Sequence, residues 1–140
     1  MKKRLFPFVL SVILVFSFCN ISTFAVEDRA SKTLNYYNVG CKAGSTSGTI
    51  NISYDVQANS IADSVGIESI VLYSSTGVYM TTILGSTQNG LIKTNNGSNV
   101  GTYTQTVVPG NSYYAIVTVF AEIGDNYDSR KVSTNIVTAP

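Results

Sequence analysis

Few side chains in this sequence could carry out catalysis, and they are poorly placed for it. The 140 residues include no histidine, which excludes histidine-dependent triads, histidine metal sites and the commonest general base. Cys41 lies in an apolar stretch, where the reactive thiolate is disfavoured. We therefore interpret Cys41 as a small buried hydrophobic residue, with an intermolecular disulfide as the alternative.

The acidic residues beyond the N-terminal region do not form a recognisable catalytic pair. A glycoside hydrolase needs two carboxylates that face each other across a cleft, and nothing in the spacing of these residues predicts such a pair. We expect surface charges and no catalytic residue, so the sequence predicts a protein that is not an enzyme. The six residues are Asp55, Asp63, Glu68, Glu122, Asp125 and Asp128.

One stretch, residues 122–128, gathers several oxygen ligands around a glycine. Calcium favours oxygen ligands on a flexible turn. The spacing is not that of an EF-hand, which needs a bidentate glutamate further along, and Asp, Asn and Gly are also common turn residues. We expect an ordinary turn with no metal or cofactor, and keep calcium as the alternative. The candidate ligands are Glu122, Asp125, Asn126 and Asp128.

The aromatic residues are unusual, because the chain has nine tyrosines and no tryptophan. Tyrosine is a common anchor at recognition surfaces, since its ring is rigid and its hydroxyl tolerates water. It also forms ordinary cross-strand pairs on an open sheet face, and a contiguous exposed cluster would favour recognition over that interpretation. The candidate surface aromatics are Tyr79, Tyr103 and Tyr127.

The N-terminus has the layout of a bacterial secretory signal. A basic start (residues 2–4) precedes an uncharged apolar run (residues 5–18), and Thr23 and Ala25 suit the −3 and −1 positions of a cut after Ala25. We predict a signal helix over residues 1–25 and export of the rest, with retention at the cell wall as one outcome. An uncleaved anchor is the alternative, although the apolar run is shorter than the ~20 residues that span a bilayer.

Cleavage would leave a flexible lead-in over residues 26–32 and a single domain over residues 33–140. Three of the nine basic residues leave with the signal, so six remain against eight acidic residues, a net charge of −2. No basic patch for nucleic acid survives, and no later apolar run is long enough to span a membrane. One remaining cysteine cannot form an internal disulfide, so core packing must supply the stability.

The rest of the chain follows the two-residue period of β-strands. Residues 50–57 alternate apolar and polar side chains without a fault, which is typical of a half-buried strand. A polar connection (residues 58–63) follows, and then a second apolar strand (residues 66–73). Seven or eight short strands with no amphipathic helix predict an all-β Greek-key β-sandwich. The other expected strands are residues 34–41, 78–84, 91–94, 100–108, 113–120 and 130–138.

The turn before the most apolar strand carries a recognisable motif. Val107, Pro109, Gly110 and Tyr113 match the Leu-x-Pro-Gly-Thr-x-Tyr corner of fibronectin type III modules, with Val for Leu and Asn111 for Thr. On this motif the chain resembles that immunoglobulin-like family over about residues 33–138. It also resembles small secreted bacterial proteins of uncharacterised function.

The resemblance implies an immunoglobulin-like sandwich and two structural roles. Tyr113 would be the corner tyrosine whose hydroxyl bonds back to the backbone. Tyr54 occupies the place where the family usually has a core tryptophan, and the family's adhesive Arg-Gly-Asp tripeptide is absent.

These features favour a secreted, non-catalytic binding module whose ligand is an unknown protein or glycan, in the cell envelope or beyond it. The alternative is a small toxin or bacteriocin-like effector that acts on membranes or competing cells through its strand edges. A hydrolytic enzyme ranks last. Loops usually carry function in sandwich domains, and the candidate loops are residues 86–90, 95–99 and 122–129.

Overall fold

The computed structural model describes residues 32–140, which form seven β-strands and no helix, so no helix there could cross a membrane. The expected signal over residues 1–25, its helix and almost all of the lead-in lie outside the described residues. The all-β prediction is confirmed for residues 32–140. The strands are β1 (Leu34–Ala43), β2 (Thr49–Ser74), β3 (Tyr79–Leu84), β4 (Ile92–Thr106), β5 (Ser112–Ile123), β6 (Asn126–Ser133) and β7 (Val137–Thr138).

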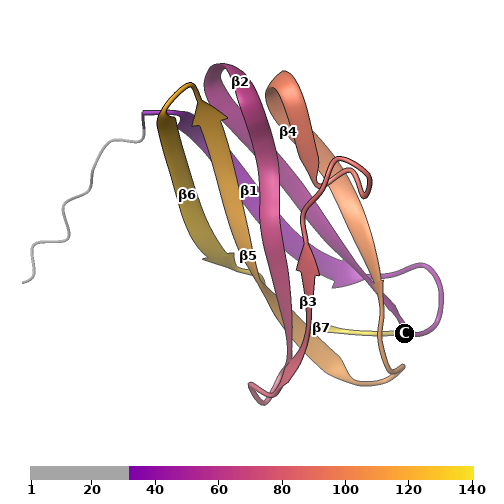
Figure 1. Cartoon of the computed structure of the whole chain (residues 1–140). Helices are drawn as coiled ribbons and strands as arrows, with labels where there is room; N and C mark the ends of the chain where they lie inside the picture. Colours follow the sequence, from indigo (N-terminus) through magenta and orange to yellow (C-terminus); the bar gives the residue numbers. More distant parts are fainter. Residues whose placement is uncertain (1–31) are drawn as a thin grey trace, which may run out of the picture.

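The 26-residue strand β2 organises one curled antiparallel sheet. Its first half pairs with β1 along one edge and with β4 along the other. Its second half pairs with β5 along one edge, and with residues 92–96 of β4 and then β3 along the other. Strands β2 and β4 bend over the same end of the molecule (Figure 1). We call β1 with residues 49–57 of β2 and residues 98–106 of β4 the first wall. The second wall is β3, residues 64–74 of β2, β5 and β6.

The expected breaks at residues 58–63 and 95–99 are wrong, because both segments lie inside strands. Gln57 pairs with Ser98 and Ala62 pairs with Asn96, with a register shift between these pairs. The two strands therefore bend together and remain partners through the bend. Their polar composition reflects solvent on the outside of the bend, where residues 59–61 are exposed.

The expected loop over residues 122–129 is also wrong, as is a single last strand over residues 130–138. Strands β5 and β6 form a hairpin in which Ile123 pairs with Asn126, and Gly124 takes the positive φ of 57° that this tight turn needs. The final segment contains two strands, β6 and β7, and β7 pairs with the start of β5.

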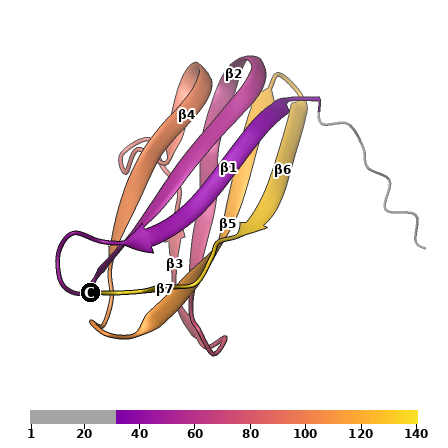
Figure 2. The same ribbon diagram turned by 180° about the vertical axis from the view of Figure 1, so that it is seen from behind.

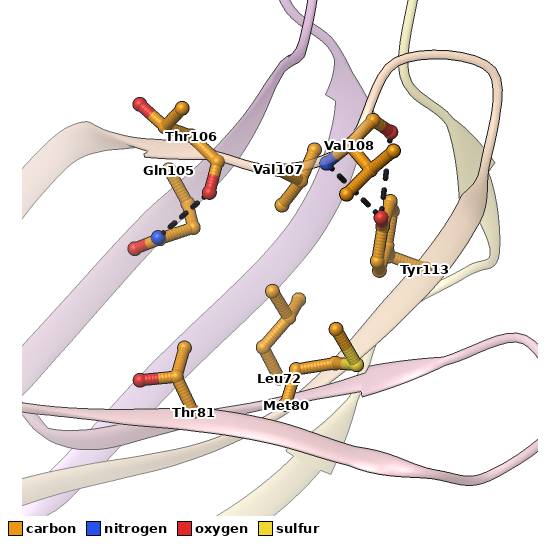
Figure 3. A pocket seen from close by; sticks show the side chains of 8 residues that line it. All are labelled: Leu72, Met80, Thr81, Gln105, Thr106, Val107, Val108 and Tyr113. Atoms are coloured by element: carbon orange, nitrogen blue, oxygen red, sulfur yellow. Dashed lines mark hydrogen bonds between the residues drawn. The ribbon is translucent and has the colours of Figure 1, made fainter.

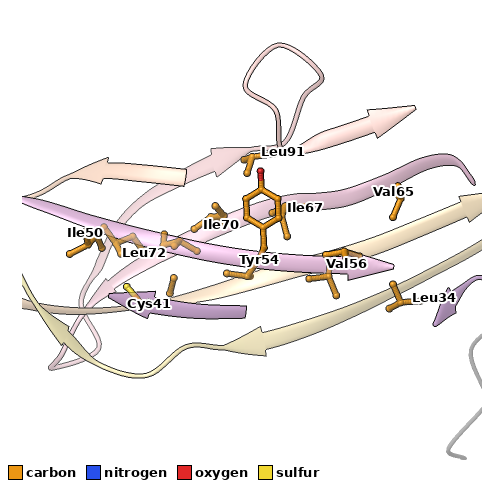
Figure 4. Packing of buried hydrophobic residues seen from close by; sticks show 14 of the residues in the cluster. Leu34, Cys41, Ile50, Tyr54, Val56, Val65, Ile67, Ile70, Leu72 and Leu91 are labelled. Carbon is orange, nitrogen blue, oxygen red and sulfur yellow. The ribbon is translucent and has the colours of Figure 1, made fainter. Parts of the chain in front are cut away.

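The apolar core lies between the two walls (Figure 4). The alternation predicted for residues 50–57 is confirmed, since their apolar side chains are buried. Tyr54 is among them, and its hydroxyl donates to the Gly90 carbonyl at 3.2 Å. A Cβ at Gly101 would come within 2.7 Å of the Tyr54 hydroxyl, so glycine there leaves room for the ring. Cys41 is 2 % exposed, as expected for a small core residue.

The corner before β5 is fixed by Tyr113, which is buried. Its hydroxyl accepts a hydrogen bond from the Val108 N–H at 3.1 Å and donates to the Val108 carbonyl at 3.3 Å. Gly110 completes the turn with φ of 79°, next to the exposed Pro109. The hydroxyl thus holds the chain segment between β4 and β5 over the end of the core.

Candidate functional site

A groove lies between β3 and the end of β4 (Figure 3). It has a volume of ≈ 390 Å³ and continues into a second hollow of ≈ 370 Å³ beside the β2–β3 turn; both are lined by Met80, Val108 and Tyr113. The other lining residues of the first are Leu72, Thr81, Gln105, Thr106 and Val107. We call the two hollows together the β3–β4 groove.

The groove has a mixed apolar and polar lining, and its described lining residues include no charged side chain. Leu72 and Tyr113 form a buried floor, whereas Val78, Met80 and Val108 at the rim are 60 %, 45 % and 55 % exposed. Exposed apolar side chains gathered around a hollow are typical of a binding surface.

Two strand edges without partners flank this groove. In residues 32–140, β3 pairs only with β2, and β4 pairs only with β2. Neither β3 nor residues 98–106 of β4 carry a charged side chain. Sheet edges of this kind are unprotected against pairing with a further strand.

Three tyrosines form a continuous row on the outer face of the second wall. Tyr73 pairs in register with Tyr79 on β3 and with Tyr114 on β5. The Tyr73 ring stacks on Tyr114 at a centroid distance of 5.3 Å and meets the edge of Tyr79 at 6.2 Å. Tyr79 is 58 % exposed. We call these three residues the tyrosine row; it ends at the strand that borders the groove.

The three candidate tyrosines from the sequence do not share one site. Tyr79 belongs to the tyrosine row, whereas Tyr103 on β4 is half-buried against the core. Tyr127 on β6 stacks on Phe120 at 5.7 Å. Sequence reasoning missed Tyr73 and Tyr114 as parts of a cluster, because their contact depends on the register of three strands. The alternation of Tyr114 with buried neighbours was the available signal that it faces outward.

Tyr127 lies close to acidic side chains. Burial raises the pKa of its hydroxyl above the usual value, and a hydrogen bond to Glu68 and the charges of Glu68 and Glu122 act in the same direction. A raised pKa keeps the phenol neutral, so Tyr127 acts here as a hydrogen-bonding aromatic group.

One of the four calcium candidates, Asp128, is engaged in contacts with the start of the described chain. Asp128 accepts hydrogen bonds from the backbone N–H groups of Lys32 and Thr33, and Gly124 donates to Asp63. In the described part of the chain, no group of three or more His, Cys, Asp or Glu side chains could hold a metal ion. Calcium binding at the 122–128 turn therefore gains no support from the geometry.

Cys41 is poorly suited to reaction. Burial raises the pKa of its thiol to about 11, and a backbone hydrogen bond to Lys42 offsets only part of that effect. The thiol therefore stays protonated near neutral pH.

No protein-family model matches the chain, and neither a curated protein nor a solved structure is significantly similar to it. Function must therefore be inferred from the groove, the free edges and the tyrosine row.

Proposed function

We propose that this protein is a secreted, non-catalytic binding module with an immunoglobulin-like fold of the fibronectin type III kind. Support for the fold comes from the strand neighbours: β1, β2 and β4 in the first wall, and β3, β2, β5 and β6 in the second. The hydroxyl of Tyr113, bonded to Val108 at the corner before β5, adds to it.

The tyrosine row beside an uncharged groove is the observation that carries the binding function. Single tyrosines on a sheet face are common, but a contiguous partly exposed row is typical of a recognition surface. The rim of the groove adds Val78, Met80 and Val108, which are all exposed. Together they give one end of the molecule a neutral, amphipathic surface.

The geometry of the row favours a protein over a glycan as its ligand. Tyr73 and Tyr114 lie almost parallel, with an interplanar angle of 14°, so each covers one ring face of the other. Tyr79 meets Tyr73 in a T-shaped contact with an interplanar angle of 78°, so Tyr73 has an aromatic neighbour on either side. A sugar ring stacks on an open ring face, whereas a protein surface can also pack against ring edges and hydroxyls.

Export is the second part of the proposal. Support comes from the basic start at residues 2–4, the apolar run at residues 5–18 and the suitable cut after Ala25. Expression of the full chain in a bacterium, followed by intact mass of the protein in medium and wall fractions, tests it. A mature protein that starts at Val26 is expected; uncleaved chain in the membrane fraction would contradict export.

The binding function is tested with fluorescently labelled protein and whole bacterial cells. Binding is expected to be saturable, lost after protease treatment of the cells, and weakened at least ~10-fold by the double change Tyr73→Ser and Tyr79→Ser. The double change Tyr36→Ser and Tyr37→Ser removes two exposed tyrosines on β1 and serves as the control. Equal binding by both double variants would contradict a role of the tyrosine row.

A further inference from the structure

We propose that the free edge of β3 pairs with β3 of a second copy of this chain, so that one antiparallel sheet continues through both molecules. This inference concerns the edge of the second wall and does not depend on the ligand of the tyrosine row. It rests on the charges of the four outer edges, on the register of β3 and on the exposed apolar side chains beside it.

The outer edges of the sheet differ in charge. Lys42 lies on β1, and Asp128, Arg130 and Lys131 lie on β6. Strand β3, Tyr-Met-Thr-Thr-Ile-Leu, has neither a charged residue nor a proline. Charges and prolines are the devices that keep edge strands from pairing with other chains. A second copy presents the same neutral edge, so the two strands meet without like-charge repulsion.

The register of β3 identifies the residue on which such pairing would centre. The Gly85 N–H donates to the Glu68 carbonyl at 2.8 Å, next to the facing residues Ser69 and Leu84. In an antiparallel ladder this bond makes Ser69 and Leu84 a non-hydrogen-bonded pair. Hydrogen-bonded and non-hydrogen-bonded pairs then alternate as far as Leu72 and Thr81, beyond which the register shifts. The backbone groups of Ile83 therefore point to β2, and those of Thr82 point away from it.

A two-fold arrangement satisfies the outward groups of Thr82. Thr82 of each copy would exchange two backbone hydrogen bonds with Thr82 of the other. The regular part of β3 that takes part is Thr81–Leu84, because the β2–β3 register shifts at Met80. Such an isologous contact is the commonest way in which identical chains associate. Threonine pairs are favourable across strands.

The arrangement also covers apolar surface that the isolated chain exposes. Met80 and Leu84 are 45 % and 71 % exposed, although both are large hydrophobic residues. The neutral edge of β4 borders the same groove, but its exposed residues there are mostly threonines. The two-fold axis would be perpendicular to the sheet, so the tyrosine rows of both copies would lie on the same face.

Analytical ultracentrifugation of protein purified from cells that express the full chain tests the proposal. The wild-type protein is expected to sediment as a dimer that dissociates on dilution. Thr82→Lys and Thr82→Glu should each weaken the dimer roughly fivefold or more, because like charges face each other at the axis. An equimolar mixture should restore the dimer. Thr102→Lys, the same change on the β4 edge, is the control and should dimerise as the wild type does.

A cysteine variant tests whether the two Thr82 positions face each other, without adding a charge. Thr82→Cys should oxidise to a disulfide-linked dimer, since facing residues of a paired ladder lie within the range that a disulfide spans. Thr102→Cys should remain a thiol, and Cys41 is buried in every variant. A monomeric wild type, a dimer unaffected by Thr82→Lys, or a mixture that stays monomeric would each overturn the proposal.

Discussion

The two lateral sides of the curled sheet differ in how their strand edges are satisfied. On the β1–β6 side, hydrogen bonds from polar and charged side chains tie distant segments together; on the β3–β4 side, the edges border an uncharged groove. We call these the tied side and the open side. Charged and polar side chains therefore protect the tied side against pairing with a further strand, whereas the open side carries no such protection.

On the tied side, a side chain hydrogen-bonds backbone groups at the edge of β1. The Asn135 side chain accepts a hydrogen bond from the Cys41 N–H at 3.1 Å and donates to the Cys41 carbonyl at 2.9 Å. Its amide therefore makes the two hydrogen bonds that the backbone of a neighbouring strand would otherwise make. The C-terminus lies beside the turn between β1 and β2 (Figure 2), where the Gly48 N–H donates to the Pro140 carbonyl at 2.8 Å. These contacts join the first and last parts of the described chain.

The largest expected effect concerns the chemistry of Cys41 on the tied side. Its thiol has a pKa of about 11, so at pH 8 the thiolate fraction is about 100-fold below that of an unfolded chain. Labelling by a thiol reagent should be at least that much slower in the native protein than in denaturant. Mass spectrometry of the peptide that contains Cys41 measures the labelling rate. Rapid native labelling would show that the tied side opens.

The raised pKa of Cys41 also predicts how the stability of the protein depends on pH. Because the folded pKa is raised, the contribution of the neutral thiol to stability is complete below the unfolded pKa near 9 and is lost as the pH rises through about 11. Cys41→Ala should remove this part of the alkaline loss, as measured by urea unfolding between pH 8 and pH 11.

Asp128→Ala should have the next largest effect. Its carboxylate accepts from the N–H groups of Lys32 and Thr33, and Thr33 is buried, whereas the Thr33 hydroxyl keeps the Ala121 carbonyl as an acceptor. Leaving these donors unpaired should lower the free energy of unfolding by about 2–3 kcal/mol and speed amide exchange at the start of β1.

The control is Asp125→Ala, in the exposed turn three residues earlier, which should change the stability by less than ~0.5 kcal/mol. Equal effects of the two changes would mean that Asp128 does not hold the tied side.

Tyr113→Phe should have a smaller effect at the end of the open side. It removes the hydroxyl bonded to Val108 but keeps the buried ring, so about 1 kcal/mol should be lost. Tyr114→Phe, a partly buried neighbour on the outer face, should cost less. Urea unfolding compares the two variants, and a larger loss for Tyr114→Phe would contradict the role of the corner hydroxyl.

The smallest effect is expected at the rim of the groove. Val78→Ser should change the free energy of unfolding by less than ~0.5 kcal/mol, because Val78 is already exposed. Val56→Ser, the same change in the buried first wall, should cost about 2 kcal/mol or more. A large loss for Val78→Ser would show that the open side is needed for folding.

Sequence reasoning worked where one residue pattern determines one local outcome. The alternation over residues 50–57 correctly predicted which side chains are buried, because a strand with one covered face has a period of two. It failed at residues 58–63, since a solvent-exposed bend in a strand has the same polar composition as a loop. The contact between Thr33 and Asp128 spans 95 residues, and the tyrosine row depends on the register of three strands; neither is encoded locally.

The continuity of β2 through both walls has a consequence for unfolding. Because this one strand pairs with β1, β3, β4 and β5, neither wall can detach without disrupting the strand that supports the other. The domain should therefore unfold as one cooperative unit, with both halves of β2 exchanging amide protons through the same global opening. Most residues that pair with β2 are distant from it in sequence. The protein should therefore also fold slowly compared with helical domains of similar size.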